Sequence, residues 1–271
     1  MKLQALVKTL NDLAPLPYAE SWDNVGLLAG DPNEHVTKAL LTVDMTLPVI
    51  NEARANGCQL VIAYHPPIFD GLKRINSQSP VGVALRHGIA IYSPHTALDA
   101  AVGGTNVFLA DIVGMQTRAP IRPVSEPGNL FKLADNAATN SSDHIGMGRV
   151  GAVAPVTCAG LIERVKYGLG IKQVLVAGPI DRTIKKVAVA AGAAGDLLTA
   201  ATRLGADAVI TGEVRHHDAL AAAAAGVTVI CTLHSCSERR ALGPFRERLA
   251  LRHPAVQFLA SECDADPFQF V

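Results

Sequence analysis

The side chains best suited to chemistry stand at the ends of four short apolar runs. Each run ends at residues that can bind a metal ion: LVIAYHPPIF at His65, IAIYSPHTALD at His95 and Asp99, DAVITGE at Glu213, and VTVICTLHSCSE at His234 and Glu238. Imidazoles and carboxylates are the protein ligands of zinc, iron, manganese and nickel. The recurrence indicates a metal site, provided that the fold brings the ends of the runs together.

Each residue also has an ordinary interpretation. His65 precedes two prolines and is also consistent with a hydrogen-bonded, buried histidine. Asp99, which we expect in a loop, is placed either to bind a metal or to cap a helix that begins near Asn106. His234 and Glu238 stand four apart at the start of an expected helix, where they would share one face, and this spacing is also common for surface pairs. Taken together, two nitrogens and two oxygens would suit a divalent ion with one position left for water.

A second group, TGEVRHH, contains Glu213, His216 and His217. Glu213 is a candidate acid or base near a metal-bound water, or a carboxylate that orients a ligand imidazole. Adjacent histidines point to different sides, so at most one of the two is expected to face the site. GAAGD, residues 192–196, lacks the phosphate-binding patterns and predicts a tight turn rather than an anion site.

Short runs rich in valine, isoleucine and leucine, bounded by glycine, proline or polar residues, predict buried strands of a largely parallel sheet. Ligands gather at the carboxyl ends of such strands. The predicted fold class is α/β: Leu3–Leu13 is expected as a helix, residues 21–30 as a loop, and strands then alternate with helices, the last a long one over residues 237–251. We expect an N-terminal half at 1–115, a linker or excursion at 116–149 that includes NAATNSSDH, and a C-terminal half at 150–271.

The composition restricts the classes of partner. Lysine plus arginine and aspartate plus glutamate each number 24, so the net charge is zero, which argues against general nucleic-acid binding and favours a small-molecule substrate. The five cysteines form no CxxC pair and are expected to be reduced thiols. Neither a signal peptide nor a membrane span is evident, so the expected location is cytoplasmic, with no membrane partner.

Six ordered blocks resemble one protein family. These are WDNVGLLAG, YHPPIF with GLKRI, IYSPHTALDAAVGGTN, GMGRVG, ITGEVRHHDAL and LHSCSERRAL, which together extend over nearly the whole chain. The chain is similar in these blocks to the Nif-three-like (NGG-interacting factor 3-like) family, also known as type 2 GTP cyclohydrolase I homologues.

The resemblance implies an α/β fold whose two halves pack together around a metal site, and a toroidal homohexamer with two metals in each subunit. It implies that His65, Asp99, His234 and Glu238 hold one ion. Many members have two adjacent histidines before the prolines, the first of which binds the second ion, and Tyr64 occupies that position here. A phenol with a pKa near 10 is a poor ligand at neutral pH, so we expect one firm site and a weak second one.

The expected function is a metal-dependent hydrolase that acts on a small nucleotide-like or phosphoester substrate, as the name GTP cyclohydrolase suggests. Glu213 and His217 are the candidate catalytic residues, as proton carriers beside a metal-bound water. The alternative is a non-catalytic protein, such as a metal chaperone or a regulatory scaffold, in which the same residues bind the metal without turnover. The expected partners are further copies of the same chain and a small-molecule substrate.

Overall fold

The computed structural model describes residues 1–124 and 145–269. The chain forms two compact units: unit 1 comprises Met1–Leu98 and Arg239–Val271, and unit 2 comprises Asp99–Glu238. Each unit is built on its own five-stranded sheet with helices, so the predicted α/β class is confirmed. The chain passes from unit 1 to unit 2 within α4 (His95–Ala100) and returns within α9 (Cys236–Arg239).

The sheet of unit 1 has the strand order β1-β4-β3-β2-β12. The strands are β1 (Gly26–Ala29), β2 (Lys38–Thr42), β3 (Leu60–Ala63), β4 (Ala90–Ser93) and β12 (Gln257–Ala260). The last four are parallel to one another, and β1 runs antiparallel to β4. The carboxyl ends of β2, β3 and β4 therefore lie at one edge of the sheet.

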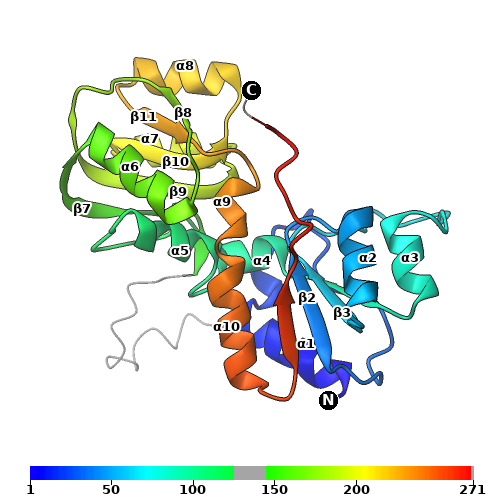
Figure 1. Ribbon diagram of the computed structural model, residues 1–271. Coiled ribbons are helices and arrows are strands. Elements are labelled where there is room, and N and C mark those ends of the chain that lie inside the picture. Colours follow the sequence, from blue (N-terminus) through cyan, green and yellow to red (C-terminus); the bar gives the residue numbers. More distant parts are fainter. Residues whose placement is uncertain (125–144, 270–271) are drawn as a thin grey trace. The chain divides into compact units, whose positions relative to one another are not determined.

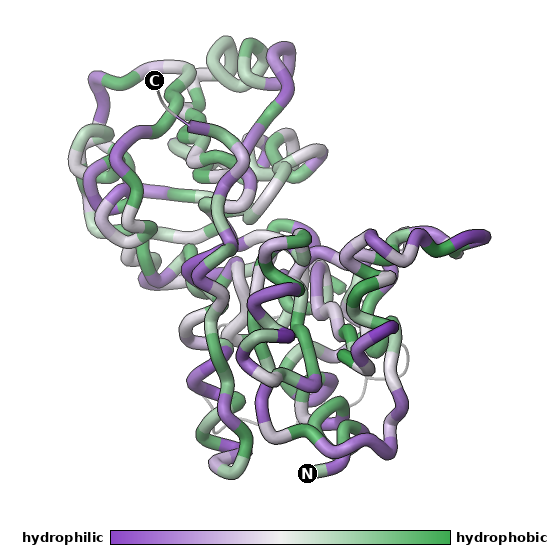
Figure 2. Tube along the Cα trace, turned by 45° about the vertical axis from the view of Figure 1, so that its right-hand side comes forward, coloured by the Kyte–Doolittle hydropathy of each residue, from purple (hydrophilic) through white to green (hydrophobic). Residues whose placement is uncertain are grey.

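Helices cover both faces of this sheet. They are α1 (Leu3–Leu13), α2 (Leu47–Ala55), α3 (Pro80–Arg86) and α10 (Leu242–Arg252), with a single 3-10 turn, η1 (Leu16–Tyr18), after α1. The apolar side chains of α1 and α10 pack with Leu41, Ile62 and Tyr92. Those of α2 and α3, which lie side by side in Figure 1, pack with Leu40 and Val61 on the other face. Figure 2 shows the alternation of hydrophilic and hydrophobic residues that produces these one-sided helices.

The sheet of unit 2 has the strand order β7-β9-β10-β11-β8. The strands are β7 (Arg149–Thr157), β8 (Leu175–Ala177), β9 (Thr183–Ala193), β10 (Ala208–Glu213) and β11 (Thr228–Cys231). The central strands β9, β10 and β11 are parallel, whereas β7 and β8 are antiparallel to their neighbours. The carboxyl ends of the three central strands again share one edge.

Helices α5 (Thr105–Ile112) and α6 (Cys158–Leu169) pack on one face of this sheet through a common apolar cluster. The other helices are α7 (Leu197–Arg203) and α8 (His216–Ala224), the second of which lies beside β8 and β11 (Figure 1). A two-stranded ribbon of β5 (Arg122–Pro123) and β6 (Gly146–Met147) precedes β7. The strongest local helix signals are in α6, where the Thr157 hydroxyl accepts from the Gly160 amide and Gly170 ends the helix with a φ of 68°.

Three local expectations were wrong. Residues 21–30 are not a continuous loop, because Gly26–Ala29 pairs with β4 as strand β1. Asp99 lies in a helix, α4, rather than in a loop. The helix expected over residues 237–251 is broken between Arg239 and Leu242, which yields the separate helices α9 and α10.

The units divide within α4 and α9 rather than around residues 116–149. The reason is that the last strand, β12, pairs with β2, which returns the end of the chain to unit 1. The segment NAATNSSDH of the expected excursion lies outside the described residues. None of the five cysteines forms a disulfide. Among the described residues, no helix has the length and apolar content that are needed to span a membrane.

Candidate metal centre

In unit 1, polar residues follow each of the three parallel strands β2, β3 and β4. Asp44 follows β2, His65 follows β3, and His95 follows β4 as the first residue of α4. His65 is fixed by its backbone, since its amide donates to the Val43 carbonyl, and by its ring, whose Nδ1 lies 2.9 Å from Asp44 Oδ1. A proton on Nδ1 shared with this carboxylate leaves the Nε2 lone pair available to a metal, which is the usual arrangement of a ligand histidine.

His95 repeats the arrangement with another carboxylate. Its Nδ1 lies 2.8 Å from Asp23 Oδ1, while Asp23 Oδ2 accepts from the backbone amide and the hydroxyl of Thr96. Burial alone would raise the pKa of Asp23, but the hydrogen bonds from His95 and Thr96 outweigh it and lower the pKa below its ordinary value. His95 also has a positive φ of 28°, a strained conformation for a residue other than glycine.

Tyr64 lies beneath these two imidazoles. Its side chain is fully buried within the apolar cluster that includes Tyr92 and Leu98. The Tyr64 ring meets His65 edge-on at 5.3 Å and His95 at 5.8 Å between centroids. The two imidazoles in turn lie 5.4 Å apart. The Tyr64 ring therefore packs against both imidazoles and restricts their orientation.

In unit 2, a third histidine–carboxylate pair occurs at His234. Its Nδ1 lies 3.0 Å from Glu213 Oε1, at the end of β10, so Glu213 has the orienting position that was one of its two predicted roles. The other ring nitrogen, Nε2, lies 3.3 Å from Glu238 Oε1. Glu238 is only 2% exposed, although it is a carboxylate. A buried carboxylate beside an imidazole nitrogen is a donor set for a cation.

His234 lies in the loop between β11 and α9, ahead of the helix on which we expected it, and Glu238 lies within α9. Leu233 has a φ of 73°, and with His95 it is one of the two residues other than glycine with positive φ in the described chain. The hydroxyl of Ser237 donates to the His234 carbonyl at 2.6 Å and accepts from the Gly192 amide at 2.8 Å. The turn is thus attached to the end of β9.

Glycine at positions 192 and 212 makes room for the turn. A Cβ at Gly192 would lie 2.7 Å from Glu238 Oε1 and 3.1 Å from His234 Nε2. A Cβ at Gly212 would lie 2.8 Å from His234 Cα. Since real Cβ contacts of this length are essentially absent, both strands approach the donors as bare backbone. GAAGD does form the predicted tight turn between β9 and α7, but its first glycine also packs against the donors.

Asp99 is 7% exposed and belongs to unit 2. Its carbonyl accepts from Asn106 Nδ2 at 3.1 Å, and Asn106 Oδ1 accepts from the Ala191 amide at 2.8 Å. Gly192, the residue after Ala191, donates its amide to the Ser237 hydroxyl. Asp99 and the His234–Glu238 turn are therefore anchored to successive residues of β9.

Buried Arg149 reinforces this anchor. Its guanidinium donates to the carbonyls of Gly146 and Gly148, at 2.6 and 2.7 Å, and reaches the Ala100 carbonyl at the end of α4 at 3.4 Å. The side chain is fully buried. Asn106 and Arg149 are positioning residues that no ligand pattern in the sequence identified, although both lie inside the quoted blocks IYSPHTALDAAVGGTN and GMGRVG.

His216 and His217 are both exposed at the start of α8, and their rings contact each other at 5.4 Å. Neither ring is buried, because α8 begins at His216 and both histidines lie in its exposed first turn. That at most one of the two faces the site stays a prediction.

The types of donor found at His65, His234 and Glu238 suit a divalent ion. In unit 1, His65 has an oriented ring, and in unit 2 an oriented imidazole nitrogen and a buried carboxylate oxygen share a cradle that a Cβ would fill. Two nitrogen donors plus carboxylate oxygens are a suitable set for zinc, iron, manganese or nickel. The donor types do not select among these metals.

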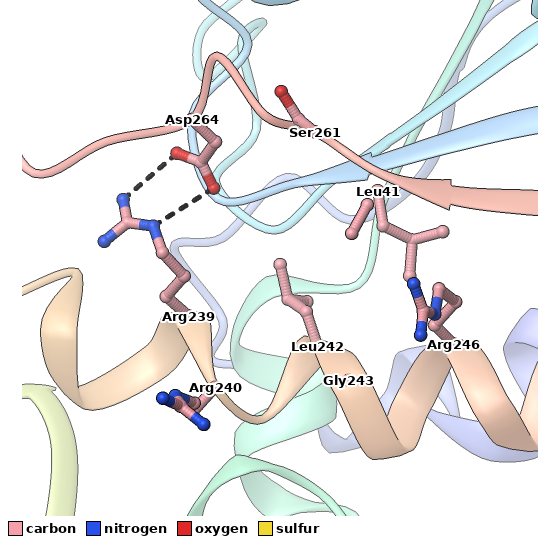
Figure 3. Close-up of a pocket in the computed structure, with 9 residues that line it drawn as sticks. Leu41, Arg239, Arg240, Leu242, Gly243, Arg246, Ser261 and Asp264 are labelled. Carbon is pink, nitrogen blue, oxygen red and sulfur yellow. Dashed lines mark hydrogen bonds and ion pairs between the residues drawn. The ribbon is translucent and has the colours of Figure 1, made fainter. Parts of the chain in front are cut away.

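A separate groove of about 230 Å³ lies between α10 and the end of β12 in unit 1. It is lined partly by Arg239, Arg240 and Arg246. Figure 3 shows both oxygens of Asp264 facing Arg239, to which they are bound at 3.0 and 3.3 Å. With its carboxylate engaged by an arginine and no imidazole in its lining, this groove lacks the donors of a transition-metal site.

Comparison with known proteins places these residues in context. The family model described as Duf34/NIF3 (NGG1p interacting factor 3) matches residues 1–267. NIF3-like protein 1 of Rattus norvegicus is 32% identical over an alignment that covers 100% of this chain and 93% of the relative. A Clostridium perfringens protein named GTP cyclohydrolase 1 type 2 homolog is 31% identical, with 100% of both chains covered.

Solved structures of similar proteins share the fold of this chain. A Staphylococcus aureus hypothetical protein superimposes with a TM-score of 0.86 at 28% identity, covering 100% of this chain and 99% of the other. A Bacillus cereus protein related to NIF3 gives a TM-score of 0.87 with the same coverage. At 22% identity, the second comparison shows a shared fold.

Proposed function

The chain belongs to the Duf34/NIF3 family, and on that premise we propose that it is a divalent-metal-dependent hydrolase acting on a small nucleotide-like or phosphoester substrate. The observation that carries the proposal is the His234–Glu238 pair, with one imidazole nitrogen held by Glu213 and the other beside a buried carboxylate. The printed name of the Clostridium perfringens relative, GTP cyclohydrolase 1 type 2 homolog, is the reason for a nucleotide-like substrate.

We propose His65, His234 and Glu238 as ligands of one ion, with Asp99 as the fourth on the basis of the family resemblance. Both chain passages between the units lie at members of this set, at Asp99 in α4 and at Glu238 in α9. His65 and His234 each have Nδ1 on a carboxylate, which prepares both rings to donate through Nε2.

A bound divalent ion would lower the pKa of a coordinated water toward 7 and polarise the substrate. Glu213 is then the favoured proton carrier, because it contacts the His234 ring and is itself half exposed, with a side-chain exposure of 55%. Glu238 contributes a buried negative charge that stabilises a cation at His234. His217 remains the second candidate proton carrier, on the exposed start of α8.

Tyr64 lowers the affinity for a second ion. Many family members have a histidine where this chain has a phenol, and the phenol ring is buried against His65 and His95. His95 could donate through Nε2, but among the described residues of unit 1 one further oriented nitrogen, that of His65, lies beside it. One firm and one weak position is the occupancy that we propose.

The test is a hydrolysis screen on metal-free and reloaded protein, with mononucleotides and simple phosphoesters as substrates. The proposal expects turnover that requires zinc, iron, manganese or nickel and that falls at least 100-fold in Glu238→Gln. Glu213→Gln should reduce kcat while metal content is kept. Stoichiometric metal binding without turnover of any compound would instead support the metal chaperone or scaffold.

A further inference from the structure

The chain has one tryptophan, Trp22, and that side chain is 58% exposed. Its indole contacts Phe69, which is 48% exposed, with ring centroids 6.0 Å apart and an interplanar angle of 37°. Large aromatic rings normally bury most of their surface, so two that contact each other and still face solvent form an unusual surface. We refer to Trp22 and Phe69 as the aromatic ledge.

The ledge is held by contacts on each side. Asn24 Nδ2 donates to the Ile68 carbonyl at 2.7 Å, which ties the segment with Trp22 to the segment with Phe69. The neighbouring Asp23 is engaged by His95 and Thr96. Both rings are therefore carried by segments that are held in place by hydrogen bonds. Little free energy would then be needed to order these segments when a ligand binds.

The ledge adjoins the imidazoles of unit 1. Trp22 meets His95 edge-on, with centroids 6.0 Å apart and an interplanar angle of 72°. His95 contacts His65 at 5.4 Å. A flat ligand stacked on Trp22 would thus have the oriented histidines of unit 1 at its edge.

The segment after Phe69 favours an anionic ligand. Lys73 and Arg74 are exposed and make no hydrogen bond or ion pair with any residue in the described part of the chain. Asp70 is the one acidic residue among residues 66–79. A stacking surface followed in the chain by unpaired cations suits a nucleotide, because every base has a π-face and its phosphate attracts lysine and arginine.

We propose that Trp22 and Phe69 bind the planar heteroaromatic ring of a small anionic ligand, and so select the substrate class of the hydrolase. The inference rests on the proposed function for its meaning, but ring binding can be measured without turnover. A contact with a second copy of the chain is the competing use of the same surface, since Leu72 and Ile75 on that segment are also about half exposed.

The single tryptophan makes the test specific, because all indole fluorescence comes from the ledge itself. AMP is added to the Glu238→Gln protein, in which turnover is suppressed, and Trp22 fluorescence is recorded. We expect saturable quenching by AMP, weaker binding of uncharged adenosine, and no quenching by ribose 5-phosphate. Phe69→Ala should weaken AMP binding about 5- to 100-fold. Tyr167→Ala, which removes an aromatic ring that is 91% exposed in unit 2, should leave it unchanged.

Three results would overturn the proposal: no saturable quenching by AMP, equal quenching by ribose 5-phosphate, or full affinity in Phe69→Ala. A fluorescence change on dilution of the protein alone would assign the ledge to a contact between copies and also reject it. Circular dichroism of each variant verifies folding. If AMP quenches but no substrate is hydrolysed, the ledge stands and the hydrolase proposal fails. If hydrolysis proceeds without quenching, the hydrolase proposal stands and the proposal for the aromatic ledge fails.

Discussion

Gly192 lies at the closest approach between backbone and donors in unit 2. Gly192→Ala would place a Cβ 2.7 Å from Glu238 Oε1 at a φ of 61°. We expect a loss of about 1–3 kcal/mol in the free energy of unfolding and weaker zinc binding, because the donors must move away. Denaturation and zinc titration measure the two effects.

Gly195 provides the matched control for this substitution. It lies in the same turn with a φ of 51°, but nothing lies within 4 Å of a Cβ there. Gly195→Ala should therefore show the backbone strain without the loss of zinc affinity. Equal zinc affinities in the two variants would contradict the role that we give to Gly192.

Tyr64 offers a gain-of-function test. Tyr64→His restores the nitrogen ligand of the family motif, so metal content should rise from about one ion per chain toward two. Tyr64→Phe keeps the ring that packs on His65 and His95 but adds no nitrogen, and its content should stay at the parental value. Two ions in the parent protein, or no increase in the histidine variant, would show that Tyr64 does not limit the second position.

From the sequence, candidate donors can be proposed more readily than the residues that orient them. His65 and His234 each follow a recognisable apolar strand, and Glu213 ends one. Asp23, Asp44 and Asn106 act through contacts with residues 72, 21 and 7 positions away, respectively. Such pairings depend on strand order, which a single sequence does not specify.

At the scale of elements, Glu52 of α2 holds the segment after β12. Its carboxylate accepts from the Ser261 hydroxyl and from the amides of Glu262 and Cys263. Burial alone would raise the pKa of Glu52, but these hydrogen bonds lower it below the ordinary value. A lowered folded-state pKa contributes stability above the unfolded pKa, and this stability is lost as pH falls through the folded value.

Glu52→Gln should therefore reduce the free energy of unfolding by about 1 kcal/mol at pH 7, a figure discounted for solvent screening. The difference between parent and variant should shrink below pH about 4. Denaturant titrations at neutral and acidic pH provide the comparison. If the difference in free energy of unfolding between parent and variant grows on acidification, the stabilising role of Glu52 is contradicted.

The elements themselves were predicted unevenly. α1 was predicted with its bounds because Leu3, Leu6, Leu10 and Leu13 recur at helical spacing and are buried. β1 was missed because its four residues follow a polar turn and show little alternation. α4 was missed because six residues give no helical period, and because its first residue, His95, has a positive φ. The return of β12 to the first sheet is a long-range pairing that local pattern does not encode.

For the whole molecule, we propose a homohexamer on the basis of family resemblance. Light scattering should give six times the 28.4 kDa mass of the chain. A site enclosed by the ring would select substrates by their access to the cavity rather than by charge, which agrees with the zero net charge of the chain. Mononucleotides should therefore be better substrates than nucleic acids. A stable monomer in dilute solution would reject the ring, and faster turnover of long nucleic acid would reject the enclosed site.

Metal content is the most direct measurement of the central claim, that His65, Asp99, His234 and Glu238 hold a divalent ion. The protein is purified without chelator and analysed by elemental mass spectrometry beside His234→Ala and His216→Ala. We predict about one tightly bound ion per chain in the parent and in His216→Ala, whose ring lies on the exposed start of α8, and almost none in His234→Ala. Full metal content in a folded His234→Ala protein would contradict the account.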